Sequence, residues 1–123
     1  MDTTSAMEDS GVDLPELLAR VEYDRELLRE VFEIFRQEFP PLNLALNEAV
    51  ARKDLAEIRI AAHTITGMLA SLSFTKATVT ATRIGRMARE SATEGIPSEV
   101  LRMERNIAAA QAELELVCQE VIH

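Results

Sequence analysis

Apolar residues recur at alternating spacings of three and four along four long segments of the chain. Such spacing is typical of an α-helix that turns one face toward a core. The four stripes are Leu28, Val31, Phe35, Phe39, Leu42, Leu46 and Ala49; Leu55, Ile58, Ala62, Ile65, Leu69 and Leu72; Ala77, Ala81, Ile84 and Ala88; and Val100, Met103, Ile107, Ala110, Leu114, Val117 and Val121. Because short connections join these segments, we predict an all-α fold, an antiparallel four-helix bundle.

Acidic residues mark the starts of three predicted helices. Asp24 precedes the first long stripe, and Asp54 with Glu57 has the spacing of a capping box before the second. Asp13 with Glu16 has the same spacing and opens a short additional N-terminal helix. This helix is too short to stand alone, so we expect it to lie as a lid on the bundle.

The remaining helix ends are predicted from a threonine and from prolines. Thr75 is expected to cap a helix that runs to about residue 92, and the last helix is expected to begin near residue 98. Pro40 and Pro41 interrupt the first long stripe. Since proline lacks a backbone donor and clashes with the preceding turn, we expect a kink or a break there.

Composition supports a single helical domain. The chain has 123 residues, of which 47% are hydrophobic and only 4% aromatic, so residues that favour strands are scarce. The length fits one domain with its own core. The start of the chain is polar and acidic, and we predict that residues 1–12 form a disordered acidic N-terminus before a bundle over residues 13–123.

Charge and cysteine usage restrict the partners and the compartment. The 21 acidic and 13 basic residues give a formal charge of −8, which argues against a nucleic-acid binder. No apolar run is long enough to cross a membrane, and the first residues do not resemble a signal peptide. Cys118 is the single cysteine, so it cannot form an intramolecular disulfide. We therefore predict a cytoplasmic protein that binds neither nucleic acid nor membrane. We also expect a monomer, because the bundle closes on its own core.

His63 is predicted to face solvent. On a helical wheel it lies ~140° from Ile58, well away from the apolar stripe of its own helix. The same outer face carries mostly small or polar residues, namely Ala56, Arg59, Thr66, Gly67 and Ala70. Gly67 costs ~1 kcal/mol inside a helix and no turn signal accompanies it. We interpret it as a bare patch through which a protein surface or a phosphoryl group approaches the imidazole; close packing of a neighbouring helix is the alternative.

Basic residues gather near His63 in an otherwise acidic chain. Residues 58–89 contain no Asp or Glu but hold Arg59, Lys76, Arg83, Arg86 and Arg89. If the two helices form a hairpin that turns near Phe74, Gly85 lies beside His63 and Arg89 beside Arg59. This cationic segment indicates an acidic partner or a phosphate. A solvated basic face, with Arg86 and Glu90 paired, is the alternative.

The run Ala62-His63-Thr64-Ile65-Thr66-Gly67, followed by Leu72, resembles the His-x-Leu-Lys-Gly signature of histidine-containing phosphotransfer domains. The similarity extends from Asp13 to about Leu116. It implies a four-helix bundle in which His63 accepts a phosphoryl group from an aspartyl phosphate on one receiver domain and passes it to another. It also implies a phosphocarrier without kinase activity, whose partners are response-regulator receiver domains and a hybrid sensor kinase. No cofactor is expected, because the receiver would supply Mg²⁺.

Two positions depart from the family pattern. The family's lysine is Thr66 here, and the glycine after Leu72 is Ser73. We therefore expect Arg59 or Arg86 to replace the lysine in holding phosphate. The predicted phosphate- and partner-binding residues are Arg59, Thr66, Gly67, Ala70 and Arg86, with Ile60, Met68 and nearby alanines as an apolar docking patch. The departures also leave open a degenerate adaptor that binds a receiver without carrying phosphate.

Two other classes fit the sequence less well. Histidine kinases place an acidic residue directly after the phosphorylated histidine, but Thr64 follows His63 and no Gly-rich nucleotide-binding domain is present. A metal-binding bundle is suggested only by the Glu-x-x-His spacing of Glu120 and His123. One such pair is too few for a di-iron site, so we predict no metal site.

Overall fold

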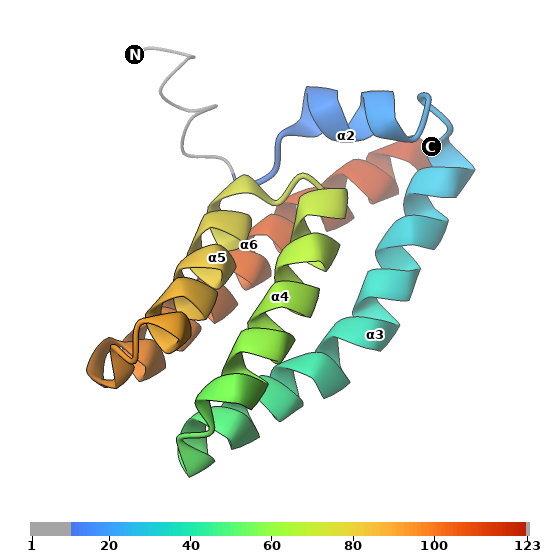
Figure 1. Ribbon diagram of the computed structural model, residues 1–123. Helices are drawn as coiled ribbons and strands as arrows, with labels where there is room; N and C mark the ends of the chain where they lie inside the picture. The colour runs from blue at the N-terminus through green and yellow to red at the C-terminus, as the bar shows by residue number, and fades with distance from the viewer. Residues whose placement is uncertain (1–10, 123) are drawn as a thin grey trace.

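A computed structural model describes residues 11–122 and the side chains of residues 11–119. Five α-helices and one short 3₁₀ helix make up the described chain, which has no strand (Figure 1). The helices are α2 (Leu14–Arg20), α3 (Arg25–Arg52), α4 (Leu55–Ser71), α5 (Thr75–Arg89) and α6 (Ile96–Ile122), with η1 (Thr93–Gly95) before α6. The predicted all-α class is confirmed.

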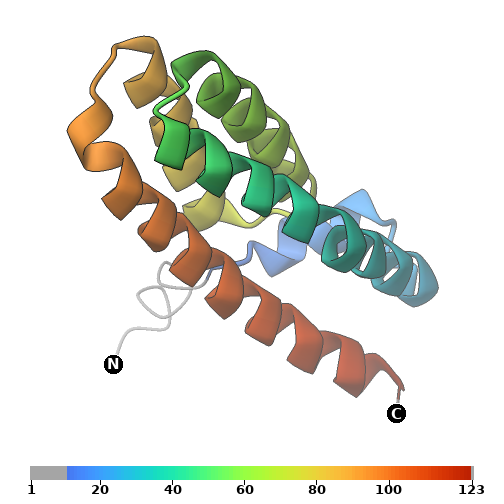
Figure 2. The ribbon, with the colours of Figure 1, turned by 90° about the horizontal axis from the view of Figure 1, so that it is seen from below.

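Helices α3 to α6 alternate in direction and form the predicted four-helix bundle (Figures 1 and 2). Helix α4 packs against α3 and α5, and α6 packs against α5 and α3. Helices α3 and α6, with 28 and 27 residues, are longer than α4 and α5, with 17 and 15. The N-terminal end of α3 and the C-terminal end of α6 project beyond the α4–α5 turn, and α2 lies across this end of the bundle (Figure 2). The short N-terminal helix is thus confirmed as a lid.

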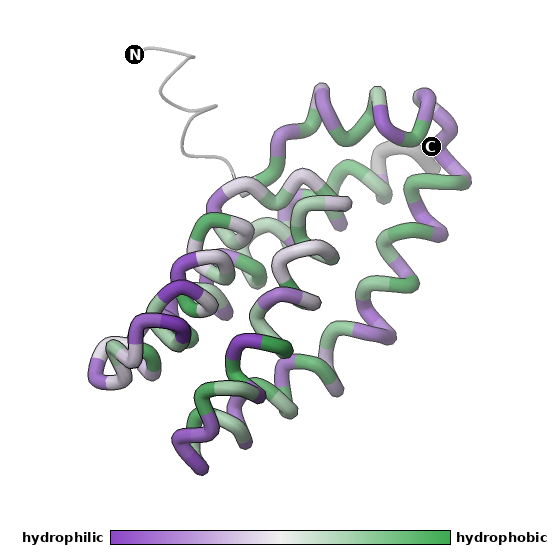
Figure 3. Tube along the Cα trace, viewed as in Figure 1, coloured by the Kyte–Doolittle hydropathy of each residue, from purple (hydrophilic) through white to green (hydrophobic). Residues whose placement is uncertain are grey.

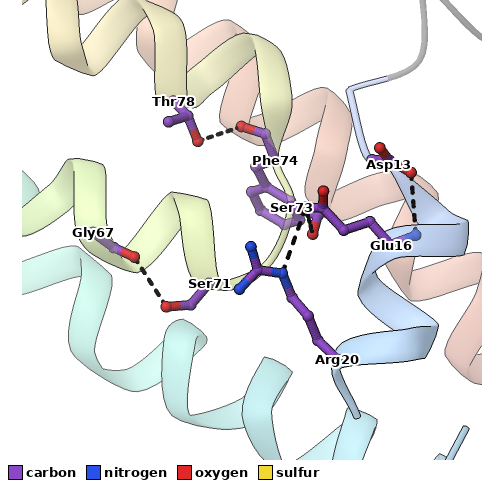
Figure 4. A network of polar contacts seen from close by, with 8 residues as sticks. All are labelled: Asp13, Glu16, Arg20, Gly67, Ser71, Ser73, Phe74 and Thr78. Carbon is purple, nitrogen blue, oxygen red and sulfur yellow. Dashed lines mark hydrogen bonds and ion pairs between the residues drawn. The ribbon is translucent and has the colours of Figure 1, made fainter. Parts of the chain in front are cut away.

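Ser73, in the α4–α5 turn, links α2 to the bundle through hydrogen bonds (Figure 4). Its hydroxyl donates to the Glu16 carboxylate (2.7 Å), and its carbonyl oxygen accepts the Asp13 backbone N–H (2.8 Å). Only half of the predicted capping box therefore forms: Asp13 accepts from the Glu16 N–H at 3.2 Å, while the Glu16 side chain turns to Ser73 and Arg20. Ser73 has φ 56°, a left-handed conformation that favours the glycine expected here.

The other helix starts follow the sequence with one exception. Asp24 accepts the Leu27 N–H at 3.0 Å, and Asp54 accepts the Glu57 N–H at 3.2 Å. The predicted Thr75 cap is wrong, because Thr75 is the first residue of α5 and Phe74 occupies the cap position without a side-chain bond. Phe74 is fully buried and meets the Phe35 ring edge-on at 5.5 Å. Burial of this ring sets where α5 begins.

Helix α3 runs unbroken through Pro40 and Pro41, so of the predicted kink or break, the break is wrong. Each proline removes the donor for the carbonyl four residues earlier, here Arg36 and Gln37. Both of those residues are exposed, so water can bond the freed carbonyl oxygens. Packing of the apolar stripe on both sides of the prolines holds the helix together, with Phe35 buried before them.

The connection between α5 and α6 lies a few residues earlier in the chain than predicted. Helix α5 ends at Arg89, where residue 92 was expected, and α6 begins at Ile96, where residue 98 was expected. Pro97 lies in the first turn of α6, where its missing N–H has no helical partner to lose. Ile96 is buried, so the core extends to the first residue of this helix.

The core follows the predicted stripes. Side chains of all five helices meet inside the bundle, and hydrophobic and hydrophilic residues alternate along each helix (Figure 3). Among the largest fully buried side chains are Leu17, Leu28, Phe35, Leu46, Ile58, Ile65, Leu69, Phe74, Ile84 and Met103. In the described chain, no helix is both long and apolar enough to span a membrane.

Candidate functional site

His63 is exposed on α4, as its helical position predicted. It lines two grooves at once, one between α4 and α5 and the other between α3 and α4, and Thr64 is the only other residue common to both. His63 thus stands on the ridge between the grooves. A partner can reach the imidazole from either side.

The α4–α5 groove has a volume of about 500 Å³. Arg59 and His63 line it from α4, while Gly85 and Arg89 line it from α5. The predicted hairpin register brought these same four residues together. Much of the remaining lining is alanine, namely Ala56, Ala62 and Ala81. Because no carboxylate among the described residues lines this groove, its fixed charge is positive.

The hydroxyl groups near His63 are bonded to their own helices. Thr66 donates to the Ala62 carbonyl oxygen (2.7 Å), and Thr64 donates to that of Ile60 (3.1 Å). A hydroxyl has one proton, so Thr66 is left only to accept hydrogen bonds. Thr82, across the groove on α5, likewise donates to Thr78 (2.8 Å). The sequence predicted Thr66 as a phosphate- or partner-binding residue, but its hydroxyl proton is already donated to Ala62.

Arg86 lies outside the α4–α5 groove, although the sequence proposed it, as an alternative to Arg59, in place of the family's lysine. The residues of α5 that line the groove are Ala81, Thr82, Gly85 and Arg89; Arg86, which lies ~100° around the helix from Gly85, is not among them. Within residues 11–119, Arg86 and Glu90 do not form the ion pair that the sequence offered as the alternative. The predicted hairpin register already pointed to Arg89 as the groove residue of α5, because it placed Arg89 level with Arg59.

Arg59 and Arg89 make no ion pair within the described part of the chain, and neither does Arg86. Other arginines are partnered: Arg83 lies 3.3 Å from Glu99, and Arg20 lies 3.5 Å from Glu16. The two arginines of the groove therefore keep their donors for a ligand.

Two glycines flank His63, one in each groove, and neither is needed by the fold. Apart from its chain neighbours and the backbone of its own helix, no atom of the described chain lies within 4 Å of a Cβ added to Gly67, so the alternative of close helix packing is wrong. A Cβ at Gly85 would meet the Ala62 Cβ at 3.7 Å, an ordinary contact. Neither glycine has a positive φ. Their effect is to leave open space beside the imidazole.

The α3–α4 groove, on the other side of His63, has a volume of about 460 Å³ and is mostly apolar. Gly67 and Met68 line it from α4. From α3 it includes Ile34, whose exposed fraction is 52%. Sequence reasoning missed the α3 side of this groove, formed by Val31, Ile34, Phe35 and Glu38. Its signal was Ile34, an exposed isoleucine that follows Glu33 and lies outside the apolar stripe of α3.

The other predicted docking residues are divided between the two sides. Ile60 has an exposed fraction of 60% and lines the α4–α5 groove, whereas Met68 is half-buried against the core. Ala70 is half-buried and lines neither groove; its carbonyl oxygen accepts the Ser73 N–H at 3.0 Å.

Searched over the described residues, the chain shows no cluster of His, Cys, Asp and Glu that could hold a metal ion. The Glu120 side chain and His123 lie outside the described residues. Cys118 is a free, buried thiol. Burial raises the pKa of this thiol above its ordinary value of 9.0, and Arg36 and Arg29 act in the opposite direction.

In comparisons with known proteins, residues 30–120 match the family model described as the Hpt domain. The match covers α4, α5 and nearly all of α3 and α6, including His63. Neither the curated proteins nor the solved structures gave a match to this chain. Since the family model covers well over half of the sequence, the chain belongs to the Hpt domain family, whose members carry phosphoryl groups in two-component signalling.

Proposed function

We propose that His63 receives a phosphoryl group from an aspartyl phosphate on one receiver domain and passes it to an aspartate on another. One observation carries this proposal: His63 is the single histidine of the described residues, and it is exposed between two grooves. Each groove offers what one part of such a reaction requires. The α4–α5 groove is cationic, and the α3–α4 groove is apolar.

The chemistry asks little of the protein around His63. A lone pair on a nitrogen of the neutral imidazole attacks phosphorus, and the P–O bond to the receiver aspartate breaks. An N–P bond forms, the carboxylate leaves with its negative charge, and the other ring nitrogen releases its proton to solvent. In the second transfer, the free ring nitrogen takes back a proton from solvent and a carboxylate oxygen of the next receiver attacks phosphorus. The N–P bond breaks and neutral imidazole leaves. His63 is thus a carrier with no kinase activity of its own.

The charge of the α4–α5 groove also decides where Mg²⁺ would bind. Arg59 and Arg89 line this groove without any described carboxylate, a set of groups unsuited to a divalent cation. We therefore propose that Mg²⁺ is held by the acidic pocket of the receiver. The two arginines would then face that negative pocket.

The α3–α4 groove is the proposed docking surface for the receiver. Ile34 and Met68 offer apolar area, and Gly67 leaves room for a backbone or a helix to approach. Because His63 lines the same groove, a receiver seated there has its phosphorylated aspartate beside the imidazole. A hybrid sensor kinase would use the same surface through its own receiver. We expect this exchange in the cytoplasm, where a lone thiol such as Cys118 stays reduced.

The test is phosphotransfer from a panel of phosphorylated receiver domains to the wild-type protein and to His63→Gln. We expect an acid-labile, base-stable label on the wild type alone, as a phosphoramidate requires. Glutamine keeps a polar side chain of similar length, so binding of the receiver should persist in the variant. Equal labelling of both proteins would exclude His63. Receiver binding without any label would identify an adaptor that carries no phosphate.

A further inference from the structure

We propose that Arg59 and Arg89 form a two-sided clamp that binds the oxygens of a phosphoryl group beside His63, and that the α4–α5 groove binds free phosphate in the same way. The proposal rests on the phosphocarrier function of His63 for its role. The phosphate site itself stands on the structure of the groove.

The first step is the placement of the two guanidinium groups. Arg59 precedes His63 by one helical turn on the same face of α4, and Arg89 enters the groove from α5. Small residues from both helices, Ala62, Ala81 and Gly85, line the groove between the two arginines and His63. Gly85 in particular has no side chain to fill the space beside the imidazole.

The second step is charge. Within residues 11–119, neither Arg59 nor Arg89 has an acidic partner, and no carboxylate lines the groove around them. In a chain with a formal charge of −8, this is an unusual place for two unneutralised arginines. Arginine binds phosphate oxygens through paired N–H donors, which are stronger than neutral hydrogen bonds. The groove therefore suits a dianion.

The third step is the lack of other donors. The hydroxyl protons of Thr64, Thr66 and Thr82 are all directed to carbonyl oxygens of their own helices. Thr66 stands where the family has a lysine, and its hydroxyl oxygen lies 2.7 Å from the Ala62 carbonyl oxygen, to which it donates its single proton. The donors for a phosphoryl group must come from the arginines. A clamp from two helices thus takes the place of one lysine.

Binding of inorganic phosphate tests the clamp without any transfer. We would titrate phosphate into the wild type, Arg59→Gln and Arg89→Gln, and follow the arginine Nε–H and His63 resonances by NMR. Each substitution should weaken binding by roughly tenfold, because it removes a charge-assisted bidentate contact. Arg86→Gln is the matched control, since it removes the same charge from α5 one turn before Arg89 and outside the groove. An equal loss in all three variants, or in none, would overturn the clamp.

Labelling with a small phosphoramidate donor separates the clamp from the carrier function, because no receiver needs to dock. We expect Arg59→Gln and Arg89→Gln to slow labelling of His63 by roughly tenfold or more, while Arg86→Gln labels at the wild-type rate. If all four proteins label equally and bind phosphate equally, the clamp is wrong and the carrier function stands. If phosphate binds as expected but no protein is labelled, the site stands and the carrier function is wrong. Circular dichroism of each variant checks that the exposed substitutions leave the fold intact.

Discussion

At the scale of single residues, glycine decides how open the site is. Gly67 and Gly85 each lie inside a helix, where glycine is less favourable than alanine by ~1 kcal/mol. Neither backbone conformation nor packing requires them. They lie on opposite sides of His63, one in each groove. The chain accepts less stable helices at the positions where a partner or a phosphoryl group would approach the ring.

Substitution of Gly67 should separate stability from function. Gly67→Ala adds a methyl group into open space and should stabilise α4 by about 0.5–1 kcal/mol. Gly67→Gln should keep most of that stability but extend a side chain into the α3–α4 groove, slowing transfer from a receiver. Urea unfolding and phosphotransfer rates measure the two effects. Destabilisation by alanine, or transfer at the wild-type rate with glutamine, would contradict this account.

Cys118 gives the chain a predicted loss of stability in alkali. Its buried thiol has a raised pKa, so the unfolded chain loses this proton at lower pH than the folded protein. The contribution of the thiol is therefore complete below its ordinary pKa and is lost as the pH rises through the folded value. Between about pH 8 and about pH 10.5, the free energy of unfolding of the wild type should fall relative to that of Cys118→Ala. Urea unfolding across that range measures it, and a constant difference would disprove it.

At the scale of elements, the sequence predicted each helix but not every end. Apolar spacing located the helices, because burial of one face decides where a helix lies. The ends depended on tertiary contacts: burial of Phe74 set the start of α5, and packing kept α3 continuous through Pro40. In the site, the wheel predicted the exposure of His63, and the hairpin register brought Arg89 to the groove. The α3 wall was not predicted: Ile34 stood outside the apolar stripe, but no local pattern fixes which residues of α3 lie beside α4.

The prolines of α3 provide the prediction at this scale. Pro41 sits in an unbroken helix and leaves the Gln37 carbonyl without its backbone donor. Pro41→Ala restores that N–H and should stabilise the protein by about 1–3 kcal/mol. The matched control is Ala45→Ser, one turn later at an exposed position of the same helix, which should destabilise by less than about 1 kcal/mol. Thermal unfolding compares them. A less stable Pro41→Ala would mean that the proline is favoured by its effect on the unfolded chain.

At the scale of the whole molecule, the folded unit extends beyond the residues that the family model matches. The Hpt match begins at residue 30, yet α2 lies before it and packs across the end of the bundle. Leu17 is fully buried, and Val12 and Val21 on either side are buried as well. Through Ser73, this segment also contacts the turn that joins the two helices lining the cationic groove. The lid is therefore part of the structure that positions His63.

If α2 belongs to the cooperative unit, Leu17→Ala should lower the free energy of unfolding of the entire bundle by about 2–4 kcal/mol. Leu44→Ala is the control, because it makes the same deletion where the exposed fraction is 60%, and it should cost less than about 1 kcal/mol. Urea unfolding followed by circular dichroism should show a single transition for both proteins. A lid that unfolds separately would give instead an early transition or an unchanged midpoint for Leu17→Ala. The lid contacts the α4–α5 turn through Ser73. Loss of α2 should therefore also loosen the pair of helices that brings Arg59 and Arg89 together.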